Sequence, residues 1–204
     1  MHLWGMSLYQ FDQKYCNQGS LVAGFDEAGR GAWAGPVSAA CVIMPQSPLI
    51  TGINDSKKLT PKKREKLFEE ITATCVSYGV ALVDSVEIDR INILEATKQA
   101  MVLALSQLKV MPAILLIDGD MTIDSKIPQE AIIDGDAKSY CIAAASIIAK
   151  VTRDRLMVDL SRTFPQYGFE QHKGYGTKVH QDALKQFGCL PIHRKSYAPI
   201  RSML

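Results

Sequence analysis

The sequence predicts an α/β fold in which a mixed sheet is flanked by helices. Two strand-like apolar runs come first, and helical patterns then alternate with further apolar runs of strand length. The 204 residues are 47% hydrophobic and 22% charged, which supplies a core for one domain. The composition shifts to Gly, Lys, His and Tyr beyond residue 163. We therefore expect a main domain over residues 1–163 and a small C-terminal helical appendage over residues 164–204.

The first elements follow a leader over residues 1–20. Residues 21–25 and 37–44 are apolar runs of strand length, and the Gly-rich turn between them predicts a hairpin-like pair. A helix is then predicted to start at Thr60-Pro61, with Thr60 as its N-cap and Pro61 in the first helical position.

The later elements alternate between strand and helix. Residues 74–83 predict a third strand, and Ser85 is expected to cap a long helix. Residues 113–117 form a fully apolar run of strand length. Residues 139–160 predict a helix that is apolar nearly all round at first, so we expect it to be buried in the middle of the fold. Residues 178–187 predict one further helix.

The formal net charge of +2 identifies no partner, but the basic side chains are unevenly distributed. A basic cluster on a near-neutral background is typical of a surface that binds a polyanion. A solvated helix face is the ordinary alternative. The cluster consists of Lys57, Lys58, Lys62, Lys63, Arg64 and Lys66.

The five cysteines are scattered, odd in number and without a CxxC pair, which is typical of reduced thiols in a cytosolic protein. The first fifteen residues lack the basic and apolar regions of a signal peptide, and no apolar run approaches the length of a membrane span. We therefore expect a cytoplasmic protein that does not enter a membrane. A monomer is expected, because the sequence shows no dimerisation seam.

Acidic residues lie where three of the predicted strands end. Asp26 and Glu27 follow the first apolar run, Asp118 ends another, and Asp136 lies just past a short run that contains Ile132. Adjacent strand ends bring distant residues together, so the four carboxylates are expected to converge. Such a cluster requires cations, and all-oxygen ligands favour Mg²⁺ or Mn²⁺. Singly, each acid has a structural alternative, as a turn residue or, for Asp136, as a helix cap.

Five short motifs follow one another between residues 21 and 180. They are Asp26-Glu27-Ala28-Gly29-Arg30-Gly31 with Gly35-Pro36-Val37, Asp55-Ser56-Lys57-Lys58-Leu59-Thr60, Asp118-Gly119, Gly135-Asp136 with the helical stretch from Ile142 to Asp154, and Lys173-Gly174-Tyr175-Gly176-Thr177. In this order they resemble the motifs of bacterial ribonuclease HII, the type 2 ribonuclease H family. The chain departs from the family at Ala32-Trp33-Ala34, where Cys or Pro followed by Leu is usual.

The resemblance implies a ribonuclease H-like catalytic domain with two divalent ions, Mn²⁺ or Mg²⁺. By resemblance, Asp26, Glu27, Asp118 and Asp136 hold both ions at the scissile phosphate. The implied activity is cleavage of the RNA strand of RNA/DNA hybrids, including cleavage 5′ to a single ribonucleotide in duplex DNA. The products would carry 5′-phosphate and 3′-hydroxyl ends, and the implied role is ribonucleotide removal from DNA.

The resemblance also implies eight residues that contact the substrate. A Gly-Arg-Gly segment would read the ribose 2′-hydroxyl, a tyrosine would stack on the following deoxyribose, and four polar residues would contact phosphates. The structural alternatives are a turn that needs glycine, a partly buried tyrosine and a solvated lysine turn. The eight residues are Gly29, Arg30, Gly31, Tyr175, Lys57, Lys58, Ser146 and Lys150.

Two other functions fit the same motifs. One is a type 3-like ribonuclease that requires runs of ribonucleotides, and the other is a non-catalytic hybrid-binding protein. The four intact acids argue against the second, since a binder gains nothing from carboxylates near phosphates. Asp120 and Asp134 are interpreted as structural, and the histidines His172, His180 and His193 as surface residues whose spacing suits no metal.

Overall fold

The computed structural model describes residues 4–16, 19–47 and 49–204. A five-stranded mixed sheet in the order β3-β2-β1-β4-β5 forms its centre, which confirms the predicted fold class. β1 pairs antiparallel with β2 and parallel with β4, so the first hairpin is present as predicted. The strands are β1 (Val22–Ala28), β2 (Val37–Ile43), β3 (Ser77–Val83), β4 (Ile114–Asp118) and β5 (Gln129–Ile132).

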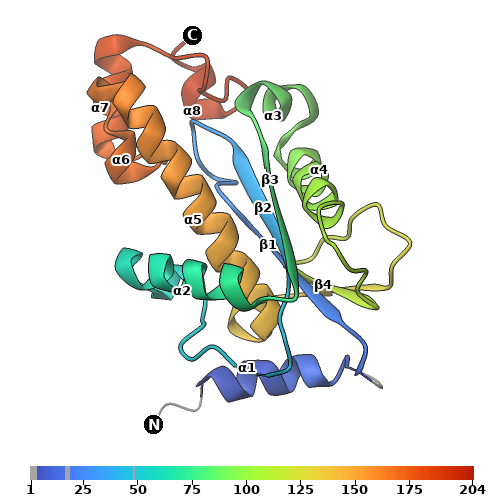
Figure 1. The fold of residues 1–204 in the computed structure, drawn as a ribbon. Helices are drawn as coiled ribbons and strands as arrows, with labels where there is room; N and C mark the ends of the chain where they lie inside the picture. Colours follow the sequence, from blue (N-terminus) through green and yellow to red (C-terminus); the bar gives the residue numbers. More distant parts are fainter. Residues whose placement is uncertain (1–3, 17–18, 48) are drawn as a thin grey trace.

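Helices cover both faces of the sheet, and the longest, α5 (Tyr140–Thr163), crosses the whole of one face (Figure 1). On β2, Ala40 and Val42 pack into the cluster under α5. Ala39 and Cys41 face the opposite side and pack against α4 (Ile93–Leu105). Because successive strand residues point to opposite faces, this alternation defines an α5 face and an α4 face of the sheet.

α5 lies very close to β1, and Gly24 makes this approach possible. A Cβ on Gly24 would lie 2.2 Å from the backbone carbon of Cys141 and the backbone nitrogen of Ile142. Ser139 caps the helix by accepting a hydrogen bond from the Ile142 backbone N–H. α5 is therefore buried at the middle of the fold, as the sequence predicts.

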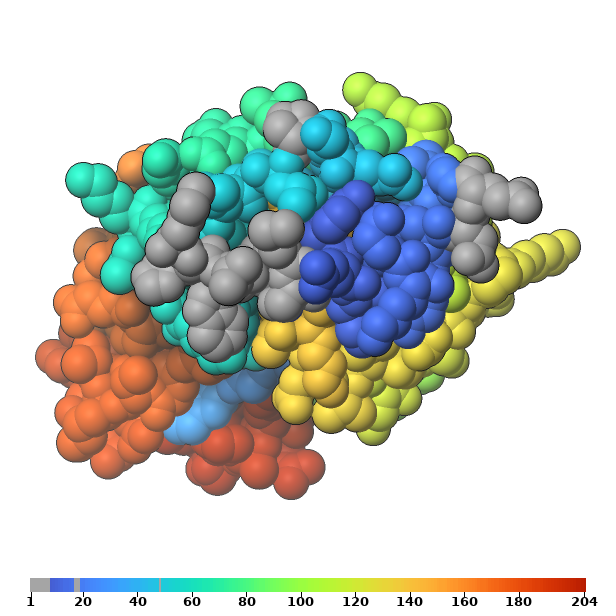
Figure 2. All heavy atoms as spheres, turned by 90° about the horizontal axis from the view of Figure 1, so that it is seen from below, coloured from blue at the N-terminus to red at the C-terminus, as the bar shows by residue number. Residues whose placement is uncertain are grey.

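The leader forms α1 (Trp4–Gln13), which covers the start of α5. Asp12 accepts a hydrogen bond of 2.8 Å from the Cys141 backbone N–H, so α1 satisfies a free donor in the first turn of α5. Seen from below, α1 lies against the segment that leads into α5 (Figure 2).

The predicted long helix that starts at Ser85 is wrong, because the structure has two helices there. Asp84, rather than Ser85, caps α3 (Ser85–Ile91) by accepting from the Glu87 N–H at 2.8 Å. Asn92 then adopts a φ of 71° and caps α4 through the N–H groups of its first turn. A single Asn in this conformation ends one helix and begins the next.

The third strand is shorter than predicted, since it begins at Ser77 rather than at Thr74. Residues 61–74 instead complete α2 (Pro61–Thr74), whose N-cap is Thr60 as predicted. The Cys75 N–H bonds back to the Ile71 carbonyl and closes the helix.

The C-terminal segment packs around a small cluster that includes Tyr167 and Phe169. Its elements are η4 (Pro165–Tyr167), α6 (Phe169–His172), α7 (Lys178–Phe187) and α8 (Ala198–Arg201). Two buried arginines attach it to the turn between β1 and β2. Arg153 donates to the carbonyls of Pro36, Ala34 and Lys173, and Arg194 donates to those of Gly35 and Arg30.

All five cysteines lie within the described residues and are free thiols. Within residues 4–16, 19–47 and 49–204, no helix has the length and apolar character needed to cross a membrane.

Candidate active site

Three carboxylates meet at one end of the sheet, on its α5 face. Asp26 lies opposite Ala40 in the β1–β2 register, which places it on that face, and Asp118 ends the neighbouring strand β4. Asp136 comes from η3 (Gly135–Ala137), immediately before α5. Each residue offers an oxygen within 4.8 Å of the oxygens of the other two. Three of the four acids predicted to converge are thus brought together.

Glu27, the fourth predicted acid, lies beside these three acids rather than among them. It follows Asp26 in β1 and pairs with Ala39, so its side chain leaves the strand on the opposite side. Its Oε1 lies 3.4 Å from Arg30 Nη1, whereas its Oε2 is buried and has no hydrogen-bond partner among the described residues. Glu27 therefore keeps an unused oxygen at the edge of the site.

The site concentrates negative charge that the protein only partly compensates. Burial raises the pKa of Asp26 well above its ordinary value, and the charges of Glu27 and Asp118 raise it further. Burial also raises the pKa of Asp136, followed by the charge of Asp118. Oxygen ligands held in this state fit a hard divalent cation such as Mg²⁺ or Mn²⁺.

Local backbone geometry holds Asp118 and Asp136 in place. The backbone N–H groups of Gly135 and Asp136 donate to Asp118 Oδ1 at 2.7 and 3.3 Å. Asp134, which precedes them, has a φ of 53° and directs the chain into η3. Asp134 and Asp120 are both exposed and lie outside the three-acid group.

Asp55 is a site residue that the sequence analysis did not nominate. It is buried, and its charge contributes to the raised pKa of Asp136. Its Oδ1 accepts from the Lys57 backbone N–H at 2.8 Å, so it caps η2 (Ser56–Lys58). An Asp directly before Ser-Lys-Lys is a helix-capping signal that could have identified this role.

η2 carries the two predicted phosphate-binding lysines in different positions. Lys57 Nζ lies 3.5 Å from Asp136 Oδ2, at the mouth of the acidic site. Lys58 points toward Asp55, with 3.8 Å between Nζ and Oδ2. Ser146 is buried in α5 and accepts from the Ser56 backbone N–H at 3.2 Å. Ser146 therefore holds η2 from below and does not face the solvent.

A cavity of about 480 Å³ opens over Asp26, Glu27 and Asp118. It gathers six of the predicted substrate residues and leaves out Lys58 and Ser146. The six are Gly29, Arg30, Gly31, Lys57, Lys150 and Tyr175.

The two glycines of the Gly-Arg-Gly segment lie in different surroundings, so the structure explains glycine at one position and not at the other. Gly29 has a φ of 93°, and a Cβ there would lie 2.0 Å from Nε of Arg153, which three carbonyls hold in place. Turn geometry and packing therefore explain Gly29. A Cβ on Gly31 would meet nothing within 4 Å, so neither packing nor a positive φ demands glycine at that position.

Tyr175 extends over the cavity from the loop between α6 and α7. Its ring lies 5.9 Å from Lys150 Nζ and 5.5 Å from Arg153 Cζ, and about a third of the residue is exposed. Trp33, part of the segment that departs from the family, packs against Gly176, where a Cβ would lie 2.2 Å from the indole. The Trp33 N–H also donates to the Gly174 carbonyl at 2.8 Å. The departure thus supports the Tyr175 loop.

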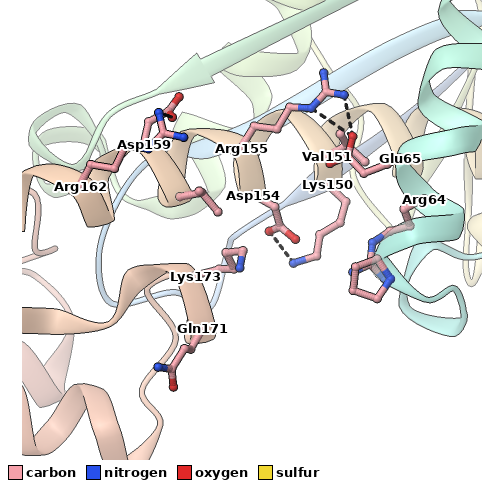
Figure 3. A pocket seen from close by; sticks show the side chains of 12 residues that line it. Arg64, Glu65, Lys150, Val151, Asp154, Arg155, Asp159, Arg162, Gln171 and Lys173 are labelled. Carbon is pink, nitrogen blue, oxygen red and sulfur yellow. Dashed lines mark hydrogen bonds and ion pairs between the residues drawn. The ribbon is translucent and has the colours of Figure 1, made fainter. Parts of the chain in front are cut away.

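A larger cleft of about 640 Å³ adjoins the cavity, and Lys150 lines both. It lies between α2, α5 and the end of α6, with Gln171 and Lys173 on the third side (Figure 3). Lys150 bonds to Asp154 at 2.8 Å, and Arg155 bonds to Glu65 at 2.6 Å. Three cations of the cleft, Lys150, Arg155 and Arg162, are therefore ion-paired. At the acidic site, Asp136 and Glu27 each have one cation within 4 Å, Lys57 and Arg30 respectively.

The prediction that the histidines are surface residues is wrong. His180 and His193 are fully buried, and His172 is nearly so. Burial is the main cause of the lowered pKa of all three, which falls to about 4 for His180 and His193. Aromatic packing in the C-terminal segment, which one sequence does not reveal, buries them.

The mixed sheet, the buried central helix and the acids at adjacent strand ends define the class of ribonuclease H-like nucleases. A solved structure of ribonuclease H2 from Pyrococcus horikoshii superimposes with a TM-score of 0.74 and 32% identity. The match covers 90% of this chain and 96% of that one.

The chain belongs to the ribonuclease HII family, whose model matches residues 23–200. It is 53% identical over 192 residues to a ribonuclease HII of Acetivibrio thermocellus, a match that covers 94% of this chain and 75% of that protein. It is 50% identical to a ribonuclease HII of Endomicrobium trichonymphae, with 97% and 95% covered. The chain is therefore an endoribonuclease of the ribonuclease H type.

Proposed function

We propose that the chain hydrolyses the RNA strand of RNA/DNA hybrids, and also cuts 5′ to a single ribonucleotide in duplex DNA. One observation carries the proposal: three carboxylates lie within 4.8 Å of one another, and two of them, Asp26 and Asp118, line an open cavity. The cellular role would be ribonucleotide removal from DNA, performed by a monomer.

The acids are proposed to hold two divalent ions, Mg²⁺ or Mn²⁺. Such ions activate a water nucleophile and stabilise the leaving oxygen, which yields 5′-phosphate and 3′-hydroxyl ends. Asp26, Asp118 and Asp136 supply oxygens that already lie close together. Glu27 fits as the fourth ligand because no group in the described part of the chain bonds to its buried Oε2, a state that is costly unless a ligand satisfies it.

The Gly-Arg-Gly segment is proposed to recognise the ribose 2′-hydroxyl with its backbone. The open space at Gly31 supports close approach by a sugar, since no protein atom occupies it. The backbone of Arg30 is fixed because its carbonyl accepts from Arg194 Nη1 at 2.8 Å. Tyr175 is proposed to stack on the deoxyribose that follows the ribonucleotide.

Lys57, Lys58 and Lys150 are proposed to contact phosphates, and Ser146 to contribute through its hydrogen bond to Ser56. The electrostatic surroundings support phosphate binding most strongly for Lys57. Partial burial acts to lower the pKa of Lys57, but the charges of Asp136 and Asp26 raise it, so Lys57 is a cation beside the acids. It can hold a phosphate at the point where the carboxylates would repel it.

The test uses a labelled DNA duplex that carries one ribonucleotide, with Mg²⁺, Mn²⁺ or a chelator. The expected result is one metal-dependent nick 5′ to the ribonucleotide, and loss of at least about a hundredfold in rate for Asp118→Asn. Asp120→Asn is the matched control, because Asp120 is exposed two residues away and lies outside the three-acid group.

Turnover retained by Asp118→Asn would contradict the assignment of the metal ligands. Cleavage of a continuous RNA/DNA hybrid without a nick at the single ribonucleotide would instead indicate a type 3-like specificity. Binding of the hybrid without cleavage under either metal would indicate a non-catalytic binder.

A further inference from the structure

A buried chain of hydrogen bonds leads through two histidines to the backbone of Tyr175. The carbonyl of Tyr175 lies 3.0 Å from His180 Nδ1, and His180 Nε2 lies 3.0 Å from His193 Nε2. The Leu190 backbone N–H lies 2.8 Å from His193 Nδ1. Both rings are fully buried, so no solvent competes for these contacts.

The carbonyl decides where the protons lie. A carbonyl oxygen only accepts, so His180 carries its proton on Nδ1 and its Nε2 is an acceptor. His193 must then donate from Nε2, and its Nδ1 accepts from the Leu190 N–H. A second proton on His180 would place its Nε2–H against the Nε2–H of His193 and break the chain. A second proton on His193 would lie on Nδ1, which is 2.8 Å from the Leu190 N–H and 3.2 Å from the Leu190 carbonyl oxygen.

His172 holds the other side of the same loop. The Gly174 N–H donates to His172 Nδ1 at 3.2 Å, and His172 Nε2 bonds to the Tyr167 carbonyl at 2.8 Å. Its ring stacks on His180 with 4.5 Å between centroids and 12° between planes. Ring nitrogens therefore bind a backbone group on each side of the Tyr175 side chain.

The backbone of this loop is held tightly, whereas the Tyr175 ring remains free to contact a ligand. Trp33 and Ala34 donate from their N–H groups to the Gly174 carbonyl, and Arg153 Nη1 donates to the Lys173 carbonyl at 2.9 Å. The ring of Tyr175 is partly exposed and lines the cavity over the acids.

We infer that His180 and His193 are positioning residues that set the location of the Tyr175 ring. They thereby favour a ribonucleotide followed by DNA over continuous RNA. The inference rests on the proposed role of Tyr175 in stacking on a deoxyribose. A stacking side chain discriminates between sugars only when its distance from them is fixed, and a displacement of about 1 Å can cost a hundredfold in rate.

Two substitutions at His180 separate its two hydrogen bonds. In His180→Asn, the amide nitrogen takes the place of Nδ1 and keeps the donor to the Tyr175 carbonyl. In His180→Gln, the longer side chain reaches the place of Nε2, so the contact with His193 is kept. The side-chain donor to the Tyr175 carbonyl is lost, which leaves that oxygen with the Thr177 backbone N–H, 2.8 Å away. The two variants are therefore matched controls for each other.

The readout is the ratio of kcat/KM for a single-ribonucleotide duplex to kcat/KM for a continuous RNA/DNA hybrid, measured on the full chain. We expect His180→Gln to lower this ratio on the order of tenfold and His180→Asn to preserve it. In a Tyr175→Ala background, His180→Gln should lower the ratio no further, because both changes act through one ring.

Two other outcomes distinguish failure of the proposed role of Tyr175 from failure of the inference about the histidines. If Tyr175→Ala leaves the ratio unchanged, the proposed role of Tyr175 fails and the inference fails with it. If Tyr175→Ala lowers the ratio while His180→Gln lowers both rates equally, the histidines only stabilise the fold and the inference alone fails.

Nitrogen NMR of the unsubstituted protein tests the chain of hydrogen bonds without any variant. The expected spectra show His180 protonated on Nδ1 and His193 protonated on Nε2. The opposite tautomers, or exchange between them, would overturn the inference even if the variants do not fold.

Discussion

Asp26 and Glu27 are neighbours in β1, yet their side chains lie in different surroundings. Asp26 shares a face with Asp118 because its cross-strand partner, Ala40, packs under α5. Glu27 leaves the strand on the other side, where Arg30 contacts one of its oxygens. Two adjacent acids at a strand end thus place their carboxylates on opposite faces of the sheet, because successive strand residues alternate in direction.

We expect alanine to affect activity at one of the two glycines that follow this pair, and stability at the other. Gly31→Ala should leave the stability unchanged, because its Cβ meets open space, but should weaken cleavage of the single-ribonucleotide duplex. Gly29→Ala should lower the free energy of unfolding by at least about 1–2 kcal/mol, because it combines a positive φ with a contact on Arg153. Urea unfolding and cleavage rates measure both.

If both alanine variants lose the same stability, the conformation of the turn requires glycine at both positions, and open space for a sugar is not the reason for Gly31. Full activity in Gly31→Ala would contradict the proposed approach of a sugar to that position.

α5 links the elements that build the site. It follows Asp136 directly, carries Ser146 beneath η2, and contributes Arg153 to the turn after β1. Its position therefore decides whether Asp26 and Asp136, which come from different elements, lie close enough together to share a cation.

Gly24→Ala tests this dependence. The new Cβ would meet backbone atoms of Cys141 and Ile142, which cannot rotate away as a side chain could. We expect a loss of about 1–3 kcal/mol or more in the free energy of unfolding, together with weaker metal-dependent activity. Calorimetry and cleavage assays provide the measurement, and an unchanged melting temperature would contradict the close packing.

The sequence predicts elements well where local signals agree. The helix at residues 139–160 combines an apolar pattern with a capping Ser139, and the structure confirms it. The break at Asn92 was missed because the residues on both sides continue a helical apolar pattern, and only the left-handed backbone of Asn92 interrupts it.

The convergence of Asp26, Asp118 and Asp136 is predictable from the sequence, because a motif or a strand end marks each of them. The burial of His180 and His193 is not predictable from the sequence, since it depends on packing between segments that are distant along the chain. Arg194 likewise reaches the Arg30 carbonyl across 164 positions, and no local pattern announces such a contact.

At the scale of the whole molecule, buried neutral histidines link folding to pH. An unfolded histidine binds its proton near pH 6.5, whereas His180 and His193 have a pKa of about 4 in the folded chain. Between these values the unfolded chain binds more protons, so their contribution to stability is complete above pH 6.5 and is lost as the pH falls toward 4. The raised pKa values of Asp26 and Asp136 act in the opposite direction.

Comparison with His193→Gln isolates the histidine effect, because both proteins contain the same acids. Gln keeps a donor near the place of Nε2 but does not titrate. Between pH 6.5 and 4 the unsubstituted chain should lose up to about 3 kcal/mol more stability than the variant. Urea unfolding in this range provides the measurement, and parallel pH curves would contradict the buried, neutral state of His193.

The attachment by Arg194 also imposes an order on biosynthesis. The ribosome makes the turn at Arg30 early, but the guanidinium that binds its carbonyl is made 164 residues later. At typical rates of translation, that interval is on the order of ten seconds. During it the nascent chain carries its acidic residues without the contact that holds the adjoining turn. Completion of the nuclease is thereby tied to late translation, so an interrupted chain would lack this support for cleavage.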